Sequence, residues 1–210
     1  GGMLDKFIGD AMMAGFGVPL PSEDAADAAV RSSIAMISEL RTWNADRLKT
    51  DKMPVGMGVG VNTDNVVTGN IGSSKRMDFT MIGDGVNLAA RLEGSCKTYG
   101  AQIIISEFTQ TKLKGIYALR ELDRIVVKGK TEPVSIFEVL DFHDEETFPA
   151  RMDVIGHFTE GLAHYRNTKF HDAIKSFKAA LDANSEDVPS KLYIERCELF
   201  EKSPPPKDWS

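Results

Sequence analysis

The spacing of apolar positions predicts that short strands alternate with helices in the first two thirds of the chain. Residues 2–16 carry two short runs of strand-forming residues around Gly9 and Asp10, which is typical of a β-hairpin. Residues 22–43 open with acidic helix-start residues after a proline and predict a long amphipathic helix. Its apolar residues recur at helical spacing: Val30, Ile34, Ile37 and Leu40.

Residues 55–61, VGMGVGV, alternate apolar side chains with glycines. This pattern predicts a strand with one apolar face and one bare face. A bare face allows a helix or another chain to approach the backbone closely.

The remaining segments continue the alternation. We expect strands at 66–72, 101–106, 117–128 and 134–140, a helix at 84–97 and a short helix near 107–113. Strands that interleave with helices, several of them joined by hairpins, predict an α+β fold in which helices pack on a mixed sheet.

A shift in composition predicts a second part of the chain. Sixteen of the eighteen glycines lie at or before Gly129, and the acidic segment 141–149, DFHDEETFP, suits a solvated linker. Residues 158–184 place small and aromatic residues as one tetratricopeptide (TPR) unit does. We expect this lone unit to pack on the first part or on a helix at 188–201. The matching positions are Gly161, Tyr165, Phe170, Ala173, Phe177 and Ala180.

Composition narrows the class of partner. The net charge of −6 disfavours nucleic acid, because a phosphate-backbone binder normally has a basic face. No apolar run approaches the roughly 18 residues of a membrane span. Cys96 and Cys197 lie far apart without metal-ligand spacing, so we expect reduced thiols. These features predict a cytoplasmic protein, or the cytoplasmic portion of a larger signalling protein.

The segment 77–93, MDFTMIGDGVNLAARLE, offers the clearest candidate chemistry. A strand-like run meets Gly-Asp-Gly, and the following helix carries Asn87 and Arg91 four residues apart, on one face. The guanidinium fork of arginine suits phosphate oxygens, and an asparagine amide can donate and accept toward a sugar. On these residues alone, a solvated arginine and a turn-capping asparagine are the commoner interpretation.

Four separated blocks resemble, in order and spacing, the catalytic domain of class III nucleotidyl cyclases. They are GGMLDKFIGDAMMAGFG, GVGVNT, VVTGNIGSSKRMDFTMIGDGVNLAARLE and IVVKGKTEPVSIFEV. The resemblance is nearest to cyanobacterial and other bacterial adenylate cyclases of the bicarbonate-responsive group. It implies a ferredoxin-like α+β sandwich over residues 1–140, a linker at 141–150 and a TPR-like helical extension at 151–210.

The resemblance implies an adenylate cyclase, a phosphorus–oxygen lyase of cyclic-nucleotide signalling. The family converts ATP to 3′,5′-cyclic AMP and pyrophosphate by in-line attack of the ribose 3′-hydroxyl on the α-phosphate. Two divalent metal ions assist, Mg²⁺ or Mn²⁺, with Ca²⁺ as an alternative. Other interpretations are a guanylate cyclase and a non-catalytic cyclase-like module for dimerisation or nucleotide sensing.

Carried over residue by residue, the resemblance assigns Asp10 to metal binding and Lys6 to selection of the purine. Thr80 takes the second base-selecting position, where many adenylate cyclases carry aspartate and guanylate cyclases typically carry cysteine. A threonine hydroxyl can accept from the adenine amino group. The structural alternatives are a turn aspartate, a surface lysine and an ordinary strand threonine.

Three further positions complete the implied site. Asn87 would orient the ribose, and Arg91 would stabilise charge that develops on the transferred phosphorus. Lys128 matches a lysine that contacts the terminal phosphates, although Lys130 could be mistaken for it. A solvated turn lysine is the structural alternative for Lys128.

The family's other metal-binding aspartate lies in a block resembling F-x-D-I-x-G-F-T, which residues 1–210 do not contain. We expect this aspartate upstream of residue 1, together with the first strand and first helices of the fold, and therefore an inactive or poorly folded isolated fragment. Family sites form between two domains, so a chain with both sets of residues implies a head-to-tail homodimer. Thr80 alone suggests bicarbonate as an effector.

Overall fold

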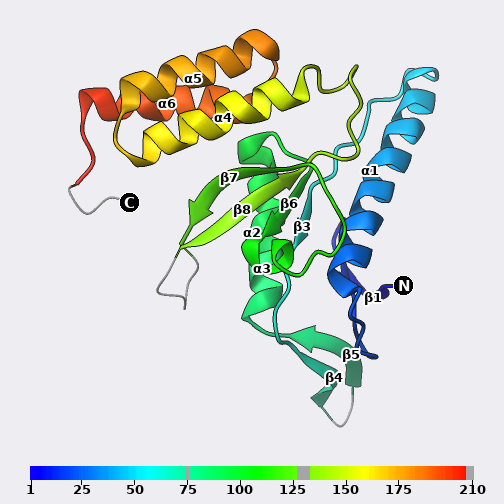
Figure 1. Cartoon of the computed structure of the whole chain (residues 1–210). Coiled ribbons are helices and arrows are strands. Elements are labelled where there is room, and N and C mark those ends of the chain that lie inside the picture. The colour runs from blue at the N-terminus through cyan, green and yellow to red at the C-terminus, as the bar shows by residue number, and fades with distance from the viewer. Residues whose placement is uncertain (74–75, 127–132, 207–210) are drawn as a thin grey trace. The chain divides into compact units, whose positions relative to one another are not determined.

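The computed structural model describes residues 1–73, 76–126 and 133–206 (Figure 1). The chain divides into two compact units. Unit 1 comprises Gly1–Leu119 and Asp123–Phe142, and unit 2 comprises Arg120–Leu122 and His143–Ser210. Within the described ranges, no helix combines the length and apolar character needed to cross a membrane.

A mixed four-stranded sheet forms the centre of unit 1. Its order is β3-β6-β8-β7, with β3 parallel to β6 and β6 antiparallel to β8. The strands are β3 (Val59–Val61), β6 (Ile103–Ser106), β7 (Leu119–Ile125) and β8 (Val134–Val139). This arrangement confirms the predicted α+β class, although β3 is shorter than the strand expected at 55–61.

Helix α1 (Ala25–Leu48) covers one face of this sheet. Val30 and Ile37 of α1 are buried in a cluster with apolar residues of β6 and β8. The apolar spacing therefore predicts the buried face of α1 correctly. The helix begins at residue 25 rather than 22 and extends to residue 48 rather than 43.

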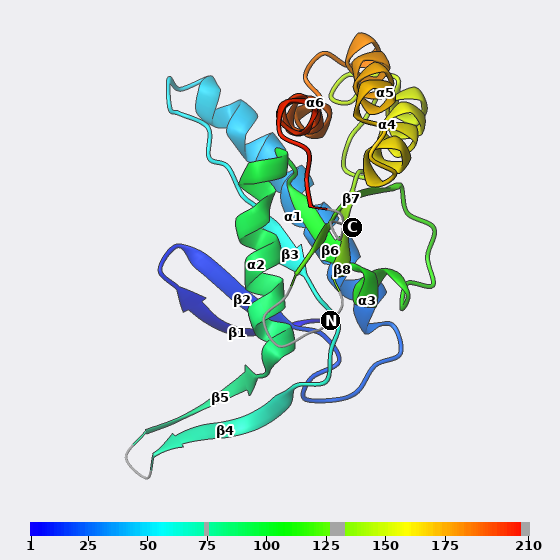
Figure 2. The same ribbon diagram turned by 90° about the vertical axis from the view of Figure 1, so that its left-hand side faces the viewer.

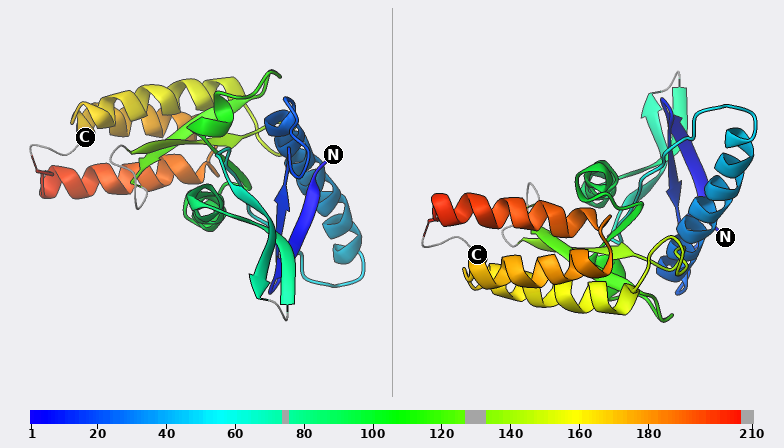
Figure 3. Two further views of the ribbon diagram at one scale, coloured as in Figure 1. Left: turned by 90° about the horizontal axis from the view of Figure 1, so that it is seen from below. Right: turned by 90° about the horizontal axis from the view of Figure 1, so that it is seen from above.

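Helix α2 (Asp84–Tyr99) packs against β3 and β6 on the other side, so that β3 lies between the two long helices (Figure 3). A Cβ atom added to Gly60 would lie 2.1 Å from the carbonyl oxygen of Ala89 and 2.4 Å from the amide nitrogen of Glu93. One added to Gly58 would lie 3.0 Å from the Cβ of Cys96. The predicted bare face of this strand is confirmed, and α2 occupies it.

Two hairpins extend from unit 1 (Figure 2). β1 (Met3–Ile8) and β2 (Ala11–Gly15) pair across a two-residue turn, in which Gly9 has a φ of 64° that favours glycine. β4 (Val67–Ser73) pairs antiparallel with β5 (Arg76–Ile82), and β1 lies against β5 (Figure 3). The short helix α3 (Glu107–Gln110) follows β6 directly.

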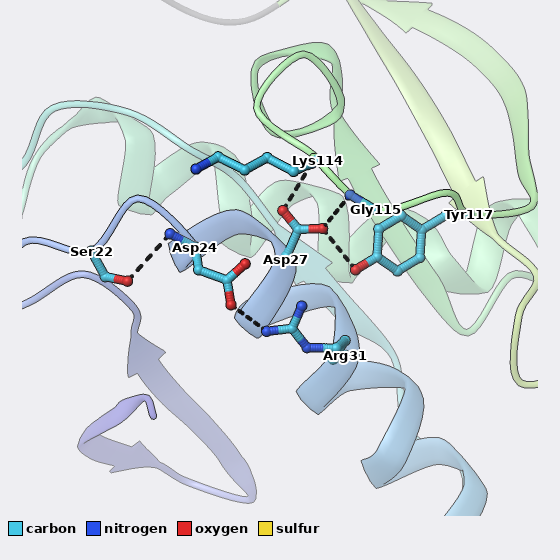
Figure 4. Close-up of polar contacts among 7 residues, drawn as sticks. All are labelled: Ser22, Asp24, Asp27, Arg31, Lys114, Gly115 and Tyr117. Carbon is cyan, nitrogen blue, oxygen red and sulfur yellow. Dashed lines mark hydrogen bonds and ion pairs between the residues drawn. The ribbon is translucent and has the colours of Figure 1, made fainter.

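A buried carboxylate ties the start of α1 to the loop before β7 (Figure 4). Asp27 is 1% exposed and accepts hydrogen bonds from the amides of Lys114 and Gly115, at 2.9 and 2.8 Å, and from the hydroxyl of Tyr117, at 2.9 Å. Burial raises the pKa of the Asp27 carboxyl, but these three donors and the nearby Arg31 outweigh burial and hold the pKa below its ordinary value.

Unit 2 contains three packed helices, α4 (Arg151–Arg166), α5 (Phe170–Ala183) and α6 (Val188–Lys202). Gly161 of α4 allows the ring of Phe177 to approach, since an added Cβ would lie 2.6 Å from that ring. Helix α6 shares the buried core, as expected of a helix pair that cannot bury its face alone. The core residues are Phe158, Leu162, Tyr165, Phe170, Ala173, Phe177, Tyr193 and Cys197.

An ion pair lies inside unit 2. The guanidinium of Arg120 donates to Asp187 at 2.6 Å, and both side chains are 1% exposed. Asp187 is also the N-cap of α6, where it accepts from the amide of Ser190. Because an unpaired buried charge is costly, the pair links residues 120–122 firmly to the helices within this unit.

Replacement of the Asp27 carboxylate will test its contribution to the fold. In Asp27→Asn one amide donor of the loop faces an NH₂ group, so the variant should be about 1–3 kcal/mol less stable at neutral pH. A folded pKa below the ordinary 3.8 means that the carboxylate stabilises the fold above that pH. This contribution is lost as the pH falls through the lower, folded pKa.

Urea unfolding at neutral pH and at about pH 3 measures the contribution of the carboxylate to the free energy of unfolding. The stability gap between Asp27→Asn and the unchanged protein should narrow in acid. Asp46→Asn, at an exposed carboxylate on the same helix, is the matched control. A gap that stays constant with pH would contradict the assigned role.

Candidate active site

The structure brings the two predicted base-selecting residues to one carboxylate. Thr80 on β5 is 8% exposed, and its Oγ1 donates to Oδ2 of Asp5 at 2.8 Å. The Nζ of Lys6, on β1, lies 3.9 Å from the same oxygen. Lys6 and Thr80 come from distant parts of the sequence, and Asp5 is the group that they share.

Asp5 occupies a bulge in β1. Leu4 pairs with Ala14 and Lys6 pairs with Met13, so Asp5 has no partner position on β2. A bulge redirects the extra residue, and such irregularities are frequent near active sites. The redirected side chain is 1% exposed, and its Oδ1 has no hydrogen-bond partner among the residues that the structure describes.

A second contact seats the β1–β2 hairpin on β5. A Cβ atom added to Gly15 would lie 2.5 Å from the sulfur of Met81, the residue that follows Thr80. The bare backbone of Gly15 therefore accommodates this methionine. Together with the bond between Thr80 and Asp5, this contact fixes the hairpin that carries Lys6 and Asp10.

Asp10 is the second residue of the β1–β2 turn and is exposed. Its carboxylate is the kind of oxygen donor that Mg²⁺ and Mn²⁺ prefer. Over residues 1–73, 76–126 and 133–206, however, no three side chains of metal-binding type gather into a cluster. The described part of the chain therefore supplies one carboxylate toward the implied metal pair, which is a partial donor set.

Asn87 and Arg91 both lie on α2, one helical turn apart and exposed. Their shared face is the arrangement expected from the sequence, and α2 holds it in place through its contact with β3. Lys128, and Lys130 with it, lies outside the described residues.

An asparagine that the sequence did not single out fixes the first turn of α2. Nδ2 of Asn62, directly after β3, donates to the carbonyl of Gly85 at 3.0 Å, and its Oδ1 accepts from the Ser106 hydroxyl at 2.6 Å. One side chain thus joins the ends of β3 and β6 to the start of the helix that carries Asn87. Asn62 lies in the GVGVNT block, and a polar residue directly after the alternating run of glycine and valine is the available signal.

The fold of unit 1 is that of a nucleotidyl cyclase catalytic domain. The family model of the adenylate and guanylate cyclase catalytic domain matches residues 6–140, and the chain belongs to this family.

The curated relatives include proteins that are named adenylate cyclases. The chain is 34% identical over 203 residues to the terminal-differentiation specific adenylate cyclase of Dictyostelium discoideum, with 94% of this chain and 9% of that protein covered. It is 40% identical over 146 residues to the adenylate cyclase of Anabaena cylindrica, with 66% of this chain and 28% of that protein covered. The chain therefore spans only a small part of either relative.

Two solved structures resemble the chain equally well but are named for different substrates. The guanylyl cyclase Cya2 aligns at 36% identity and a TM-score of 0.59, covering 66% of this chain and 69% of that one. The adenylyl cyclase CyaB from P. aeruginosa aligns at 36% identity and a TM-score of 0.58, covering 66% and 71%. Likeness to these two structures therefore does not distinguish an adenylyl cyclase from a guanylyl cyclase.

Loss of the Asn62 side chain should loosen the first turn of α2. In Asn62→Ala, the amides of Val86, Asn87 and Leu88 should exchange with solvent about tenfold faster, the effect of losing about one hydrogen bond. Hydrogen exchange followed by mass spectrometry measures this change. Asn65→Ala, at an exposed residue of the same loop, should leave these rates unchanged, and equal rates in both variants would refute the role of Asn62.

Proposed function

We propose that this chain is the catalytic part of an adenylate cyclase, a lyase that converts ATP to 3′,5′-cyclic AMP and pyrophosphate in cyclic-nucleotide signalling. Family membership and the adenylate cyclases among its relatives support the proposal. The observation that carries it is the convergence of Lys6 and Thr80 on Asp5, which supports a joint role of this ammonium and this hydroxyl toward one base.

Lys6 and Thr80 suit adenine better than guanine. Adenine presents an unprotonated N1 beside an amino group, whereas guanine presents N1–H beside a carbonyl oxygen. The ammonium of Lys6 can only donate, so it matches adenine N1 and conflicts with N1–H of guanine. The Thr80 hydroxyl can accept from the adenine amino group.

Cyclisation forms one bond and breaks one. The ribose 3′-oxygen attacks the α-phosphorus and loses its proton to solvent, and the bond from that phosphorus to the bridging oxygen breaks as pyrophosphate leaves with the electron pair. Arg91 stabilises the negative charge that grows on the transferred phosphoryl group, and Asn87 holds the ribose so that the 3′-oxygen is in line.

The bound divalent ions, Mg²⁺ or Mn²⁺ with Ca²⁺ as an alternative, would neutralise phosphate charge, and Asp10 is the residue of this chain that would hold them. Lys128 would contact the terminal phosphates. Both assignments follow from the family pattern, with Lys128 outside the described residues.

Four finer features belong to the same proposal. The chain acts as a head-to-tail homodimer with its sites at the interface, and it works in the cytoplasm. Residues 151–210 form a TPR-like extension; the small and aromatic residues in the core of unit 2 support this. Bicarbonate is the effector, a proposal that depends on Thr80 alone.

Cyclic AMP formation by the protein that carries this chain tests the activity. Turnover of ATP should exceed that of GTP, and Arg91→Ala should lower kcat by about 10²–10³-fold, as loss of one positioned charge-stabilising group does. Lys97→Ala removes an exposed cation from the last turn of α2 and serves as the control. Preferred turnover of GTP would instead establish a guanylate cyclase, and loss of activity in Lys97→Ala would contradict the specific role of Arg91.

Mixing of two inactive variants tests the homodimer. In the proposed arrangement Asp10 of one copy and Arg91 of the other serve the same site. Equal amounts of Asp10→Asn and Arg91→Ala should therefore recover about a quarter of the original activity, since half of the dimers are mixed and each has one intact site. A mixture that stays as inactive as its components would exclude shared sites.

A further inference from the structure

We infer that Asp5 sets the base specificity of the site by fixing the direction of the hydrogen bond that Thr80 can make to the base; the inference rests on the proposed nucleotide cyclisation. Asp5 is then a positioning residue, since it acts on the base through Thr80 and Lys6.

A threonine hydroxyl alone does not distinguish adenine from guanine. It can accept from the adenine amino group, or it can rotate and donate to O6 of guanine. Selectivity therefore requires a neighbour that removes one of these two options.

Asp5 is such a neighbour. A carboxylate only accepts, and the single proton of the Thr80 hydroxyl is directed to Oδ2 of Asp5 at 2.8 Å. The hydroxyl is left with lone pairs and no proton to offer. The Thr80 hydroxyl can therefore accept a hydrogen bond from an amino group of the base. A carbonyl oxygen of the base would instead face the lone pairs of the hydroxyl.

The surroundings of Asp5 strengthen this direction. The ammonium of Lys6 lies 3.9 Å from the same Oδ2, and burial of the Asp5 side chain keeps water from competing for the Thr80 proton. Among the described residues, the Oδ1 atom of Asp5 has no hydrogen-bond partner. Burial of a carboxylate oxygen without a hydrogen-bond partner costs folding free energy, because the oxygen loses its water. An apolar residue at the bulge would avoid that cost.

A purely structural role makes a different prediction. If the bond between Asp5 and Thr80 only fastens β1 to β5, its loss should lower the turnover of both nucleotides by the same factor. If Asp5 directs the hydroxyl, its loss should change the ratio between them. The ratio of kcat/KM for ATP to that for GTP separates the two roles.

The experiment uses the protein that carries this chain, with ATP and GTP as substrates. Asp5→Asn keeps the shape of the side chain but brings an NH₂ group that can donate to Thr80 and release its proton. We expect the ATP/GTP ratio to fall about fivefold to tenfold, the discrimination of one ordinary hydrogen bond. Thr80→Val should lower the ratio to a similar extent, and adding Asp5→Asn to it should cause no further change.

Two controls match these substitutions. Thr68→Val removes a hydroxyl that has no hydrogen-bond partner in the described part of the chain. Thr68 pairs with Met81, so it lies on the face of the hairpin opposite Thr80. Asp46→Asn neutralises an exposed carboxylate of α1. Neither should change the ratio, and Thr80→Ser, which keeps the hydroxyl, should preserve it.

The outcomes are distinct. A ratio unchanged in Asp5→Asn, or an additive effect in the double variant, overturns the inference. Should Asp5→Asn not fold, Asp5→Ser is measured instead, with the same fall in ratio expected and the same unchanged ratio contradicting it. Absence of cyclic product from either nucleotide in the unchanged protein refutes the proposed function itself, which is a separate result.

Discussion

The close approach of α2 to β3 is the constraint on which the rest of unit 1 depends. At Gly60 the helix backbone lies where any side chain would stand, so the position of α2 is set by contact with another backbone. Such contacts allow little adjustment, because backbone atoms cannot rotate away as side chains can. Asn62 then fixes the first turn of the same helix. Asn87 and Arg91 are thereby carried on a helix that both β3 and Asn62 hold in place.

Much of this arrangement could be predicted from the sequence, because it rests on local patterns. The alternation of glycine and apolar residues at 55–61 predicted a strand face open to close packing, and α2 occupies that face. Apolar spacing predicted the buried side of α1, and two strand-like runs around Gly9 predicted the first hairpin. The element ends were less accurate. Val55, for example, was predicted in a strand, but its carbonyl accepts from Nδ2 of Asn44 and its amide donates to Oδ1 of Asn44, and β3 begins only at Val59.

The residues that the sequence did not reveal form hydrogen bonds with residues far away in the chain. Asp5 and Thr80 are 75 positions apart, and the bulge that turns Asp5 toward β5 leaves no mark in the alternation of LDKFI. From its sequence neighbours, Asp27 looks like an ordinary acidic residue in the first turn of a helix. The groups that donate hydrogen bonds to its carboxylate, however, lie 87 to 90 positions away. Motif resemblance identified Lys6 and Thr80 as base-selecting candidates, but not the carboxylate between them.

The first hairpin also explains why Lys6 and Asp10, four positions apart, need not act together. The carboxylate beside the Lys6 ammonium is Asp5, and a two-residue turn with Gly9 in a left-handed conformation presents Asp10 at the tip of the hairpin. The bulge places Asp5 with β5, while Asp10 lies exposed in the turn. One short hairpin can therefore offer a base-selecting cation to one site and a metal-binding carboxylate to another, as the proposed dimer requires.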